Sequence, residues 1–239
     1  MKFSKLSRVY ITDPITKNQT IIIDGDRFHY LKSVMRLKLA AKFRLFNSDD
    51  GEFLVEVTAV NRSSLEVRVE EFLRPVAKEQ ELVLAMCIIK PDRMLEAIRA
   101  AVQLGATNII PVISERAQYK DVSRDRVEKS IIQSTTQSER FAVPKLSEPI
   151  SLEELAKDAS FGQVILASEA ESEDNKISNI KSFEGKVVTL VGPEGGFADE
   201  EIAMLKGHKH IHPVRLGSSV LRAEIAAIAA LSYIAMVRK

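Results

Sequence analysis

Apolar and polar residues alternate in the first third of the chain. The pattern is clearest in residues 53–57, Phe-Leu-Val-Glu-Val, and in residues 65–70, Leu-Glu-Val-Arg-Val-Glu, with the polar residues 61–64 between them. Alternation with a period of two predicts strands with one apolar face, and the short polar connection predicts that the two strands are antiparallel. We therefore expect residues 1–73 to form a small β-rich domain, a barrel or a sandwich.

The pattern changes after residues 74–78, where a proline lies among charged residues. Continuous apolar strands are predicted at residues 82–89 and 109–113, with a helical pattern at residues 93–104 between them. A strand, a helix and a second buried strand in this order form a βαβ unit, which implies a parallel sheet with a right-handed crossover. We predict a second domain, of the α/β class, over residues 79–239.

Two further helices have recognisable first turns. Ser123 precedes one of them, with Val122 and Val127 at the spacing of a hydrophobic staple. Residues 151–154, Ser-Leu-Glu-Glu, form a capping box at the start of the other, and a strand is predicted at residues 164–167. Strands and helices thus continue to alternate through the α/β domain.

Two glycine-containing loops follow near the C-terminus. Residues 187–191 predict a buried strand, and the glycine-rich residues 192–197 come directly after it. A second strand is expected to end at residues 216–217, before a long apolar helix that begins at about Ala223. Ligands bind outside the carboxyl ends of the strands in an open parallel sheet, so the two loops predict one pocket, although a tight turn with nothing bound is the simpler alternative. Neither loop contains a dinucleotide or nucleoside-triphosphate fingerprint, which argues against those ligands.

Composition narrows the class of protein only a little. The 239 residues contain 34 Lys and Arg against 33 Asp and Glu, so the overall charge does not indicate a nucleic-acid partner. The single cysteine, Cys87, excludes an internal disulfide and a cysteine-rich zinc site, and it lies in an apolar run as a small core residue would. His208, His210 and His212 alternate, but no cysteine or cluster of acids accompanies them, so we expect a strand edge and no metal.

No secretion signal or membrane segment is predicted. The first ten residues contain no apolar run of the required length, and the apolar helix at residues 225–237 is too short to span a bilayer. We expect a cytoplasmic protein without a membrane partner.

The apolar helix at residues 225–237 carries more apolar residues than one face of a sheet covers, so we expect a homodimer in which two copies of this helix pack together.

Local charge is less balanced than total charge. Residues 27–46 contain no acid and six basic residues: Arg27, Lys32, Arg36, Lys38, Lys42 and Arg44. Contact with the phosphates of a nucleic acid is one use for such a segment. The alternative is the solvated face of a short helix whose apolar residues point inward, namely Phe28, Leu31, Val34, Met35 and Leu37.

The two C-terminal loops together resemble a known pair of signature sequences. Residues 190–201, LVGPEGGFADEE, and residues 215–227, RLGSSVLRAEIAA, are similar to the signature loops of the SPOUT-class RNA methyltransferases. The similarity covers the whole chain and is closest to the ribosomal RNA small subunit methyltransferase E family, which methylates N3 of a uridine in 16S ribosomal RNA. It implies a C-terminal parallel-sheet domain with a trefoil knot, an N-terminal PUA-like β-barrel that binds RNA, S-adenosylmethionine as cofactor, 16S ribosomal RNA or the small ribosomal subunit as substrate, and a homodimer.

The resemblance also implies roles for individual residues. S-adenosylmethionine would be held around Leu166, Leu190, Gly192, Pro193, Gly195, Gly196, Leu216, Gly217, Ser219 and Leu221. Arg222 would stabilise negative charge on the uracil oxygens, and Glu194, in preference to Glu224, would accept the N3 proton. The residues expected to contact RNA are Arg8, Arg27, Arg36, Lys38, Arg116 in a Ser-Glu-Arg sequence and Arg140 in a Gln-Ser-x-Arg sequence.

Some positions depart from the pattern of that family: Ala198, Ile225, Ser218 or Ser219, Thr136 and Gln103. Ala198 removes a helix-capping hydroxyl, for which Asp199 or Glu201 would have to compensate. The glycines and Arg222 are all present. Two other functions stay open: a related SPOUT enzyme that methylates another base or a ribose 2′-hydroxyl, and an RNA-binding assembly factor without catalytic activity.

Overall fold

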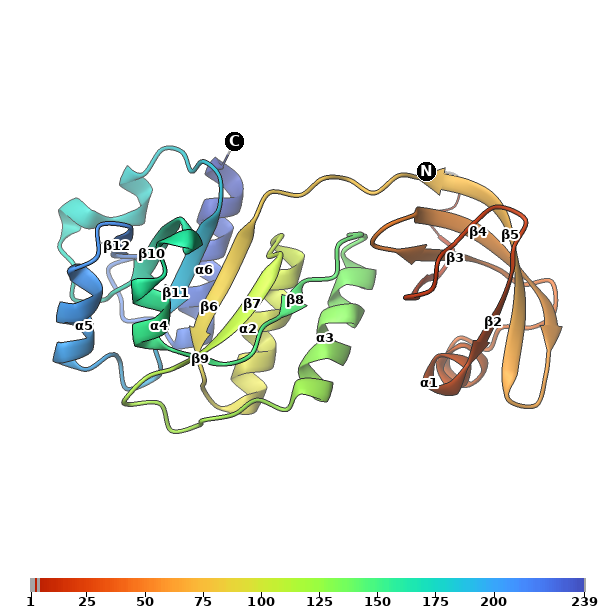
Figure 1. Cartoon of the computed structure of the whole chain (residues 1–239), viewed down its shortest axis with the longest axis horizontal. Coiled ribbons are helices and arrows are strands. Elements are labelled where there is room, and N and C mark those ends of the chain that lie inside the picture. The colour runs from red at the N-terminus through yellow and green to blue at the C-terminus, as the bar shows by residue number, and fades with distance from the viewer. Residues whose placement is uncertain (1–2, 4, 239) are drawn as a thin grey trace. The chain divides into compact units, whose positions relative to one another are not determined.

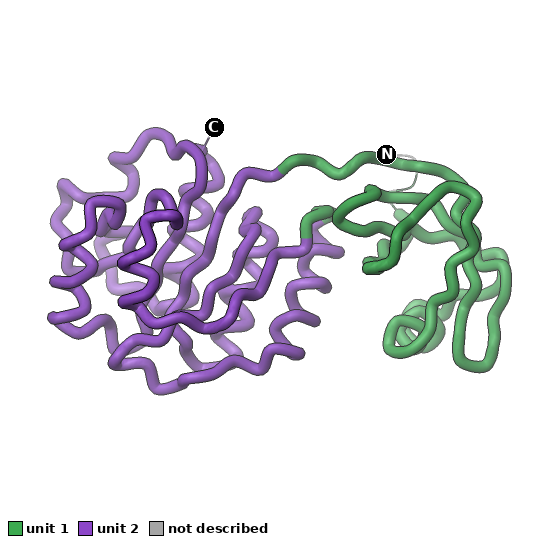
Figure 2. The backbone as a smooth tube through the Cα atoms, viewed as in Figure 1, with its two compact units in different colours: residues 1–78, 139–142 green, residues 79–138, 143–239 purple. Residues whose placement is uncertain are grey.

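The computed structural model describes residue 3 and residues 5–238 of the chain. The chain forms two compact units, one of residues 1–78 with 139–142 and the other of residues 79–138 with 143–239 (Figure 2). The sequence pattern gives no sign that four residues from within the second unit belong to the first. That the two units are an RNA-binding and a catalytic domain stays a prediction.

The N-terminal unit is built on a five-stranded sheet (Figure 1). Its strands are β1 (Arg8–Tyr10), β2 (Thr20–Asp24), β3 (Lys42–Asn47), β4 (Gly51–Val60) and β5 (Ser64–Arg74). They follow the order β1-β3-β4-β5-β2, and every pairing except the parallel one between β1 and β3 is antiparallel. Shifts in register between β4 and β5 bend the sheet round its apolar core. In the described part of the chain no pairing joins β1 to β2, so hydrogen bonds do not close the predicted barrel.

A short helical segment follows β2. α1 (Gly25–His29) continues directly into η1 (Tyr30–Val34), which is one turn of π-helix. Phe28 and Leu31 are buried, as the alternative of a solvated helix face expects, whereas Val34, which that alternative also places inward, is 66% exposed. The π-helix explains the error, because its wider turn rotates the third residue after Leu31 away from the core.

Five charged side chains of this unit form what we call the arginine–glutamate cluster: Arg8, Arg44, Arg74, Glu52 and Glu139. Glu52 is 1% exposed, and its carboxylate accepts hydrogen bonds from Arg8 Nε at 2.5 Å and from Arg74 Nε at 2.7 Å. Glu139 accepts two hydrogen bonds from Arg44, at 2.7 and 3.1 Å, and one from Arg74 at 2.9 Å. A buried carboxylate is stable only when donors of this kind replace water.

The cluster explains why residues 139–142 belong to the N-terminal unit. The Phe141 ring lies edge-on to the Phe46 ring at 6.3 Å, and the Arg8 guanidinium stacks on Phe46 at 3.4 Å from the ring centre. Burial lowers the pKa of Arg8 to about 10. Glu139 has a φ of 60°, a left-handed conformation that a residue other than glycine keeps only where its surroundings hold it. Ion pairs and aromatic packing therefore fix this segment.

The C-terminal unit contains a parallel sheet, as the βαβ pattern predicts (Figure 1). Its strands are β6 (Leu82–Cys87), β7 (Asn108–Ile113), β8 (Lys145–Leu146), β9 (Ile150–Ser151), β10 (Gln163–Ala167), β11 (Val187–Val191) and β12 (Ile211–Val214). They follow the order β12-β10-β11-β6-β7-β8, with β9 also paired to β7, and all pairings are parallel. β12 ends before the predicted residues 216–217. The carboxyl ends of the strands thus share one edge of the sheet.

Helices cover both faces of this sheet. α2 (Pro91–Gln103), α3 (Arg124–Gln137) and α6 (Ala223–Val237) share an apolar core on one face, and α4 (Leu152–Lys157) and α5 (Asp199–Lys206) share another on the opposite face. Short 3₁₀ turns lie at residues 159–161, 173–175 and 177–179. Among the helices of the described residues, none combines the length and apolar content that a membrane span requires.

Side chains of β6 alternate between these two cores. The two sets are Leu82, Leu84 and Met86 on one face and Val83, Ala85 and Cys87 on the other. Cys87 is fully buried, and burial raises the pKa of its thiol to about 12. The prediction that Cys87 is a core residue is therefore confirmed.

The first turns of three helices are stabilised in different ways. Ser151 and Glu154 form the predicted capping box on α4: the Ser151 hydroxyl accepts from the Glu154 N–H at 3.1 Å, and the Glu154 carboxylate accepts from the Ser151 N–H at 2.7 Å. At α5 the Glu201 carboxylate accepts from the Ala198 N–H at 2.9 Å, but Ala198 itself makes no side-chain capping hydrogen bond, so the part of the missing hydroxyl is not replaced. Ser123 precedes α3, but its side chain makes no capping hydrogen bond.

Candidate active site

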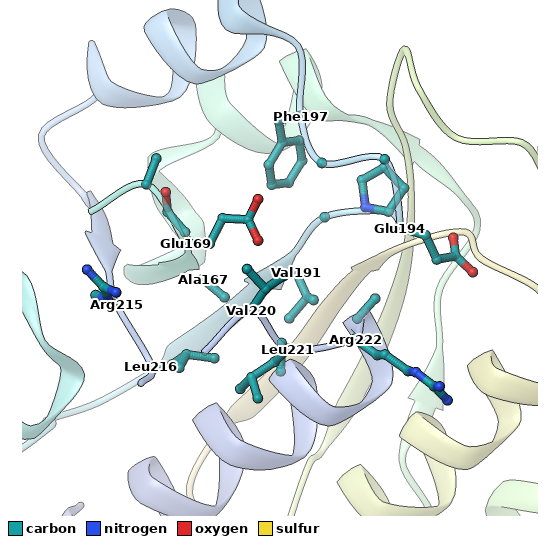
Figure 3. Close-up of a pocket in the computed structure, with 18 of the residues that line it drawn as sticks. Ala167, Glu169, Val191, Glu194, Phe197, Arg215, Leu216, Val220, Leu221 and Arg222 are labelled. Atoms are coloured by element: carbon teal, nitrogen blue, oxygen red, sulfur yellow. The ribbon is translucent and has the colours of Figure 1, made fainter. Parts of the chain in front are cut away.

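A cavity of about 630 Å³ opens at the carboxyl edge of the parallel sheet (Figure 3). Its walls come from the loops after β10, β11 and β12, from the first turns of α5 and α6, from Arg93 in the first turn of α2 and from Arg116 after β7. Parallel strands end at this edge with free backbone groups, and helices begin there with unpaired N–H groups. The volume is that of an ordinary small-molecule site. Both glycine-containing loops line this cavity.

The first loop, residues 192–197, contains three glycines in different surroundings. A Cβ atom at Gly192 would lie 2.8 Å from the Phe197 ring, so the absence of a side chain lets the ring pack against the backbone. Gly196 has a φ of 68°, which glycine adopts without strain. A Cβ atom at Gly195 would lie 3.7 Å from its nearest neighbour, an ordinary contact. The fold itself therefore does not require glycine at position 195, and the predicted approach of a ligand to this backbone stays a prediction.

The second loop, residues 216–221, has no regular secondary structure. Arg215 holds its backbone, because Arg215 Nε donates to the Gly217 carbonyl at 2.8 Å. Nothing lies within 4 Å of the place that a Cβ atom at Gly217 would take, and the Val220 side chain is 77% exposed beside the cavity. The loop thus offers backbone and apolar groups to the cavity.

Eight of the ten residues predicted to hold a cofactor line this cavity: Gly192, Pro193, Gly195, Gly196, Leu216, Gly217, Ser219 and Leu221. The other two, Leu166 and Leu190, are fully buried in β10 and β11 and pack in the core under α4 and α5. Side chains alternate along a strand, so the next residues, Ala167 and Val191, line the cavity instead. Contact of the cofactor with the backbone around Leu166 and Leu190 stays a prediction.

Several charged side chains meet at one end of the cavity. Arg93 Nη1 lies 3.7 Å from the Glu194 carboxylate, and Arg93 Nε lies 3.9 Å from the Glu224 carboxylate. Glu194 and Arg222 both line the cavity and lie at the same end of it in Figure 3. Glu224 is only 3% exposed, and its Oε2 has no hydrogen-bond partner within the described residues. Of the two carboxylates considered as proton acceptors, Glu194 is therefore the accessible one.

The two arginines predicted in the α/β domain lie in different units. Arg116 lines the cavity, and its Nη1 donates to the Gly195 carbonyl at 3.4 Å. Arg140 belongs to the four-residue segment of the N-terminal unit. The sequence pattern had placed both in one domain.

The basic residues of the N-terminal unit divide into exposed and internal ones. Arg36 and Lys38 are exposed, and the Arg27 side chain is 41% exposed. Arg44 and Arg8 are instead buried in the arginine–glutamate cluster. A buried guanidinium that is hydrogen-bonded to glutamate is not presented to RNA, so the position of Arg8 argues against its predicted contact.

The sequence patterns did not single out three charged cavity residues: Arg93, Glu169 and Arg215. Arg93 could have been found, because the helix after the strand at residues 82–89 must begin at the same edge as the glycine loops. Glu169 opens an acidic stretch at residues 169–175 that contains no recognisable motif. Arg215 comes directly after β12, in a stretch where no pattern distinguishes a side chain that points into a cavity from one that points to solvent.

The three histidines are not arranged as predicted. His208 and His210 lie in the turn between α5 and β12, with their rings 5.8 Å apart, and only His212 lies in the strand. Burial, with a smaller contribution from His208, lowers the pKa of His210. Within the part of the chain that the structure describes, no group of three His, Cys, Asp or Glu residues is arranged to hold a metal ion.

Comparison with known proteins agrees with this geometry. A family model described as the RNA methyltransferase domain matches residues 77–235, and a model described as the RNA methyltransferase PUA domain matches residues 23–70. The two matches cover most of both units. They define the class of the protein, an RNA methyltransferase that carries a PUA domain.

Individual relatives define the family within this class. The ribosomal RNA small subunit methyltransferase E of Rickettsia conorii is 38% identical over 96% of this chain and 95% of its own length. A methyltransferase from Legionella pneumophila, solved with S-adenosylmethionine bound, has a TM-score of 0.89 and 28% identity over 98% of both chains. The ribosomal RNA small subunit methyltransferase E of Neisseria gonorrhoeae, also bound to S-adenosylmethionine, has a TM-score of 0.85 and 26% identity over 95% of both chains. The chain belongs to the ribosomal RNA small subunit methyltransferase E family, as its two signature loops predict.

Proposed function

We propose that this protein transfers a methyl group from S-adenosylmethionine to N3 of a uridine in the 16S ribosomal RNA of the small subunit. The main supporting observation is that both signature loops, Glu194 and Arg222 line one cavity at the carboxyl edge of the sheet. The relatives from R. conorii and N. gonorrhoeae are named for small-subunit ribosomal RNA, which supports the substrate class.

The cavity suits S-adenosylmethionine. Its walls combine apolar side chains, such as Leu216 and Leu221, with loop backbone that carries no Cβ atom at Gly195, Gly196 and Gly217. Exposed N–H and C=O groups of such backbone can pair with the edge of an adenine ring, while the apolar side chains contact its faces. When bound, this cofactor supplies a methyl group activated by a positively charged sulfur.

The protein's own side chains would then prepare the base. A uridine N3–H is a weak acid, and the displacement at the methyl carbon needs an aligned lone pair on N3. Arg222 would stabilise the negative charge that develops on the uracil oxygens. Glu194 would accept the N3 proton, and Arg93, 3.7 Å away, would hold the Glu194 carboxylate in place.

The architecture of the family extends the proposal to the rest of the chain. We propose that the C-terminal unit carries the trefoil knot of the SPOUT class, in keeping with its parallel sheet and its similarity to the solved structures. The N-terminal unit would bind RNA through the exposed residues Arg27, Arg36 and Lys38, with Arg116 and Arg140 as further contacts.

We also propose that the enzyme works as a homodimer. α6 exposes apolar side chains, with Ile225 41% and Met236 76% accessible, and a second copy of the same helix would cover them. Arg140 of one chain would then serve the cofactor site of the other. Mixing an Arg222→Ala chain with an Arg140→Ala chain should restore activity, because one composite site would be intact. Light scattering that gives the mass of a single chain at working concentration would reject the dimer.

Mapping of the modified nucleotide tests the main proposal. The purified protein is incubated with S-adenosylmethionine and either 16S ribosomal RNA or small subunits, and the digested RNA is analysed by mass spectrometry. We expect one added methyl group on the base of one uridine, at N3. A methyl group on a ribose or on another base would identify a related activity, and RNA binding without any cofactor binding in a titration would identify an assembly factor.

A further inference from the structure

Three walls of the cavity are joined by polar side chains that have no part in the proposed chemistry. The side chains are Lys206 in the last turn of α5, Glu171 in the loop after β10, and Arg215 directly after β12. Arg215 lines the cavity at the end opposite Glu194 in the view of Figure 3. Lys206 and Glu171 are not among the residues that line the cavity. The three residues come from three of the segments that contribute to the cavity: α5, the loop after β10 and the chain after β12.

Glu171 connects the loop after β10 to α5. It is 7% exposed, one carboxylate oxygen lies 2.5 Å from Lys206 Nζ, and the other accepts from Asn175 Nδ2 at 2.9 Å. These two partners, Lys206 first, lower the pKa of Glu171. Glu169 and Ala170, which precede Glu171 directly, line the cavity, so the ion pair fixes that wall.

Arg215 connects the same loop to the second signature loop. Its Nε donates to the Gly217 carbonyl at 2.8 Å, its Nη2 to the Ser218 carbonyl at 3.4 Å, and its Nη1 to the Glu171 carbonyl at 3.4 Å. The Arg215 backbone also pairs with that of residues 175–177, through hydrogen bonds of 2.9 and 3.0 Å. One guanidinium thus bonds to both loops.

These bonds take the place of secondary structure. The cavity-lining parts of both loops lie outside helices and strands, and such backbone loses conformational freedom when a ligand orders it. That loss weakens binding unless the protein orders the loops beforehand. A planar guanidinium with several donors is suited to hold carbonyl groups that point in fixed directions.

We propose that Lys206, Glu171 and Arg215 form a polar latch that holds the walls of the cofactor cavity in their binding arrangement before the cofactor enters. The proposal rests on the proposed use of S-adenosylmethionine. Arg215 and Glu171 are positioning residues, because they act on the loops and not on the reacting atoms. Loss of the latch weakens cofactor binding and leaves turnover at saturating cofactor unchanged.

Calorimetric titration with S-adenosylmethionine tests the latch in the full-length protein. We expect the Kd to rise about 10- to 100-fold in Arg215→Ala, which removes three hydrogen bonds from a charged donor. The Kd of Arg215→Lys should lie between those of Arg215→Ala and the wild type, because an ammonium group cannot reach all three carbonyls. Glu171→Gln and Lys206→Ala should raise the Kd about 5- to 20-fold. The matched control is Lys209→Ala, an exposed lysine just beyond α5, which should stay within about twofold.

Kinetics and hydrogen exchange separate positioning from a general structural effect. The KM for S-adenosylmethionine should rise in Arg215→Ala while kcat stays within about twofold. Amide exchange of residues 216–221 should be faster without cofactor and return to the wild-type rate at saturation, whereas general destabilisation would speed exchange throughout the unit.

The outcomes distinguish the latch from the proposed function. Normal cofactor affinity in Arg215→Ala, or a lower kcat with an unchanged KM, would overturn the latch alone. If Arg215→Ala does not fold, Arg215→Lys and Glu171→Gln decide in its place, and unchanged affinity in both rejects the proposal. A wild-type protein that binds no S-adenosylmethionine would reject the proposed function together with the latch.

Discussion

The arginine–glutamate cluster and the candidate active site both concentrate charge, but they use it in opposite ways. In the cluster, Glu52 is 1% exposed and its two oxygens are bonded to Arg8 and Arg74. In the cavity, Arg222 is exposed and Glu194 is one-third exposed, among walls of backbone and apolar side chains. Buried charges that satisfy one another hold a fold together, whereas exposed charges contribute little to stability and can act on a bound molecule. The partners of an arginine therefore decide its role.

The largest effect is expected from Glu52→Gln. The substitution leaves the buried Arg8 without the carboxylate that neutralises it, while Arg74 keeps its hydrogen bond to Glu139, and breaking a buried pair such as Arg8–Glu52 costs about 3–5 kcal/mol. Urea unfolding followed by circular dichroism should show this loss in the transition of the N-terminal unit, while the folded protein keeps its affinity for S-adenosylmethionine. The matched control is Glu71→Gln at an exposed position of β5. A loss no larger than that of the control would show that the cluster does not stabilise the unit.

Arg222→Ala should show the reverse behaviour. Removal of one preorganised donor to a developing negative charge typically lowers the rate about 100- to 1000-fold, or roughly 3–4 kcal/mol. The free energy of unfolding should change by less than about 0.5 kcal/mol, because the side chain is exposed. Methyl transfer from labelled S-adenosylmethionine to RNA measures the first quantity and urea unfolding the second. Near-normal transfer would remove Arg222 from the proposed mechanism.

Acid should weaken the cluster through Glu139. Its hydrogen bonds from Arg44 lower the pKa of Glu139 below the ordinary value of 4.5. A carboxyl with a lowered folded pKa adds stability that is complete above the unfolded pKa and is lost as the pH falls through the folded pKa. The difference in melting temperature between the wild type and Glu139→Gln should therefore be constant near neutral pH and shrink below about pH 4.5. A difference that persists at pH 3 or grows there would contradict this assignment.

The smallest effect is expected from exposed charges of the N-terminal unit. We replace Arg36 and Lys38 by alanine and plot the logarithm of RNA affinity against the logarithm of salt concentration. The slope of this plot should become shallower by about 0.7–0.9 for each phosphate that the protein no longer neutralises. Stability and cofactor affinity should not change, since both side chains are in water. Arg68→Ala, at another exposed arginine of this unit, serves as the control. A salt slope equal to that of the wild type would favour the simple solvated face over a phosphate-binding role.

Local patterns were sufficient for much of the fold and for most of the candidate site. The capping box at residues 151–154, the strand at 187–191 and the start of α6 at Ala223 each follow from residues that are neighbours in sequence. The glycine loops are equally local, because a ligand that approaches backbone requires small residues within one turn. Their joint position at one cavity follows from the rule that parallel strands end at the same edge.

Only the tertiary structure decided which charged residues are internal and which face the cavity. The Arg44–Glu139 pair joins residues 95 positions apart, and Arg8 and Glu52 are 44 positions apart, so no local pattern distinguishes these arginines from the exposed Arg36. The same holds for Arg215, whose guanidinium reaches back to the Glu171 carbonyl. Periodicity reports which face of its own element a side chain occupies. The role of a charge depends on what the rest of the chain brings to that face, because water, an opposite charge and a ligand are alternative partners for the same guanidinium.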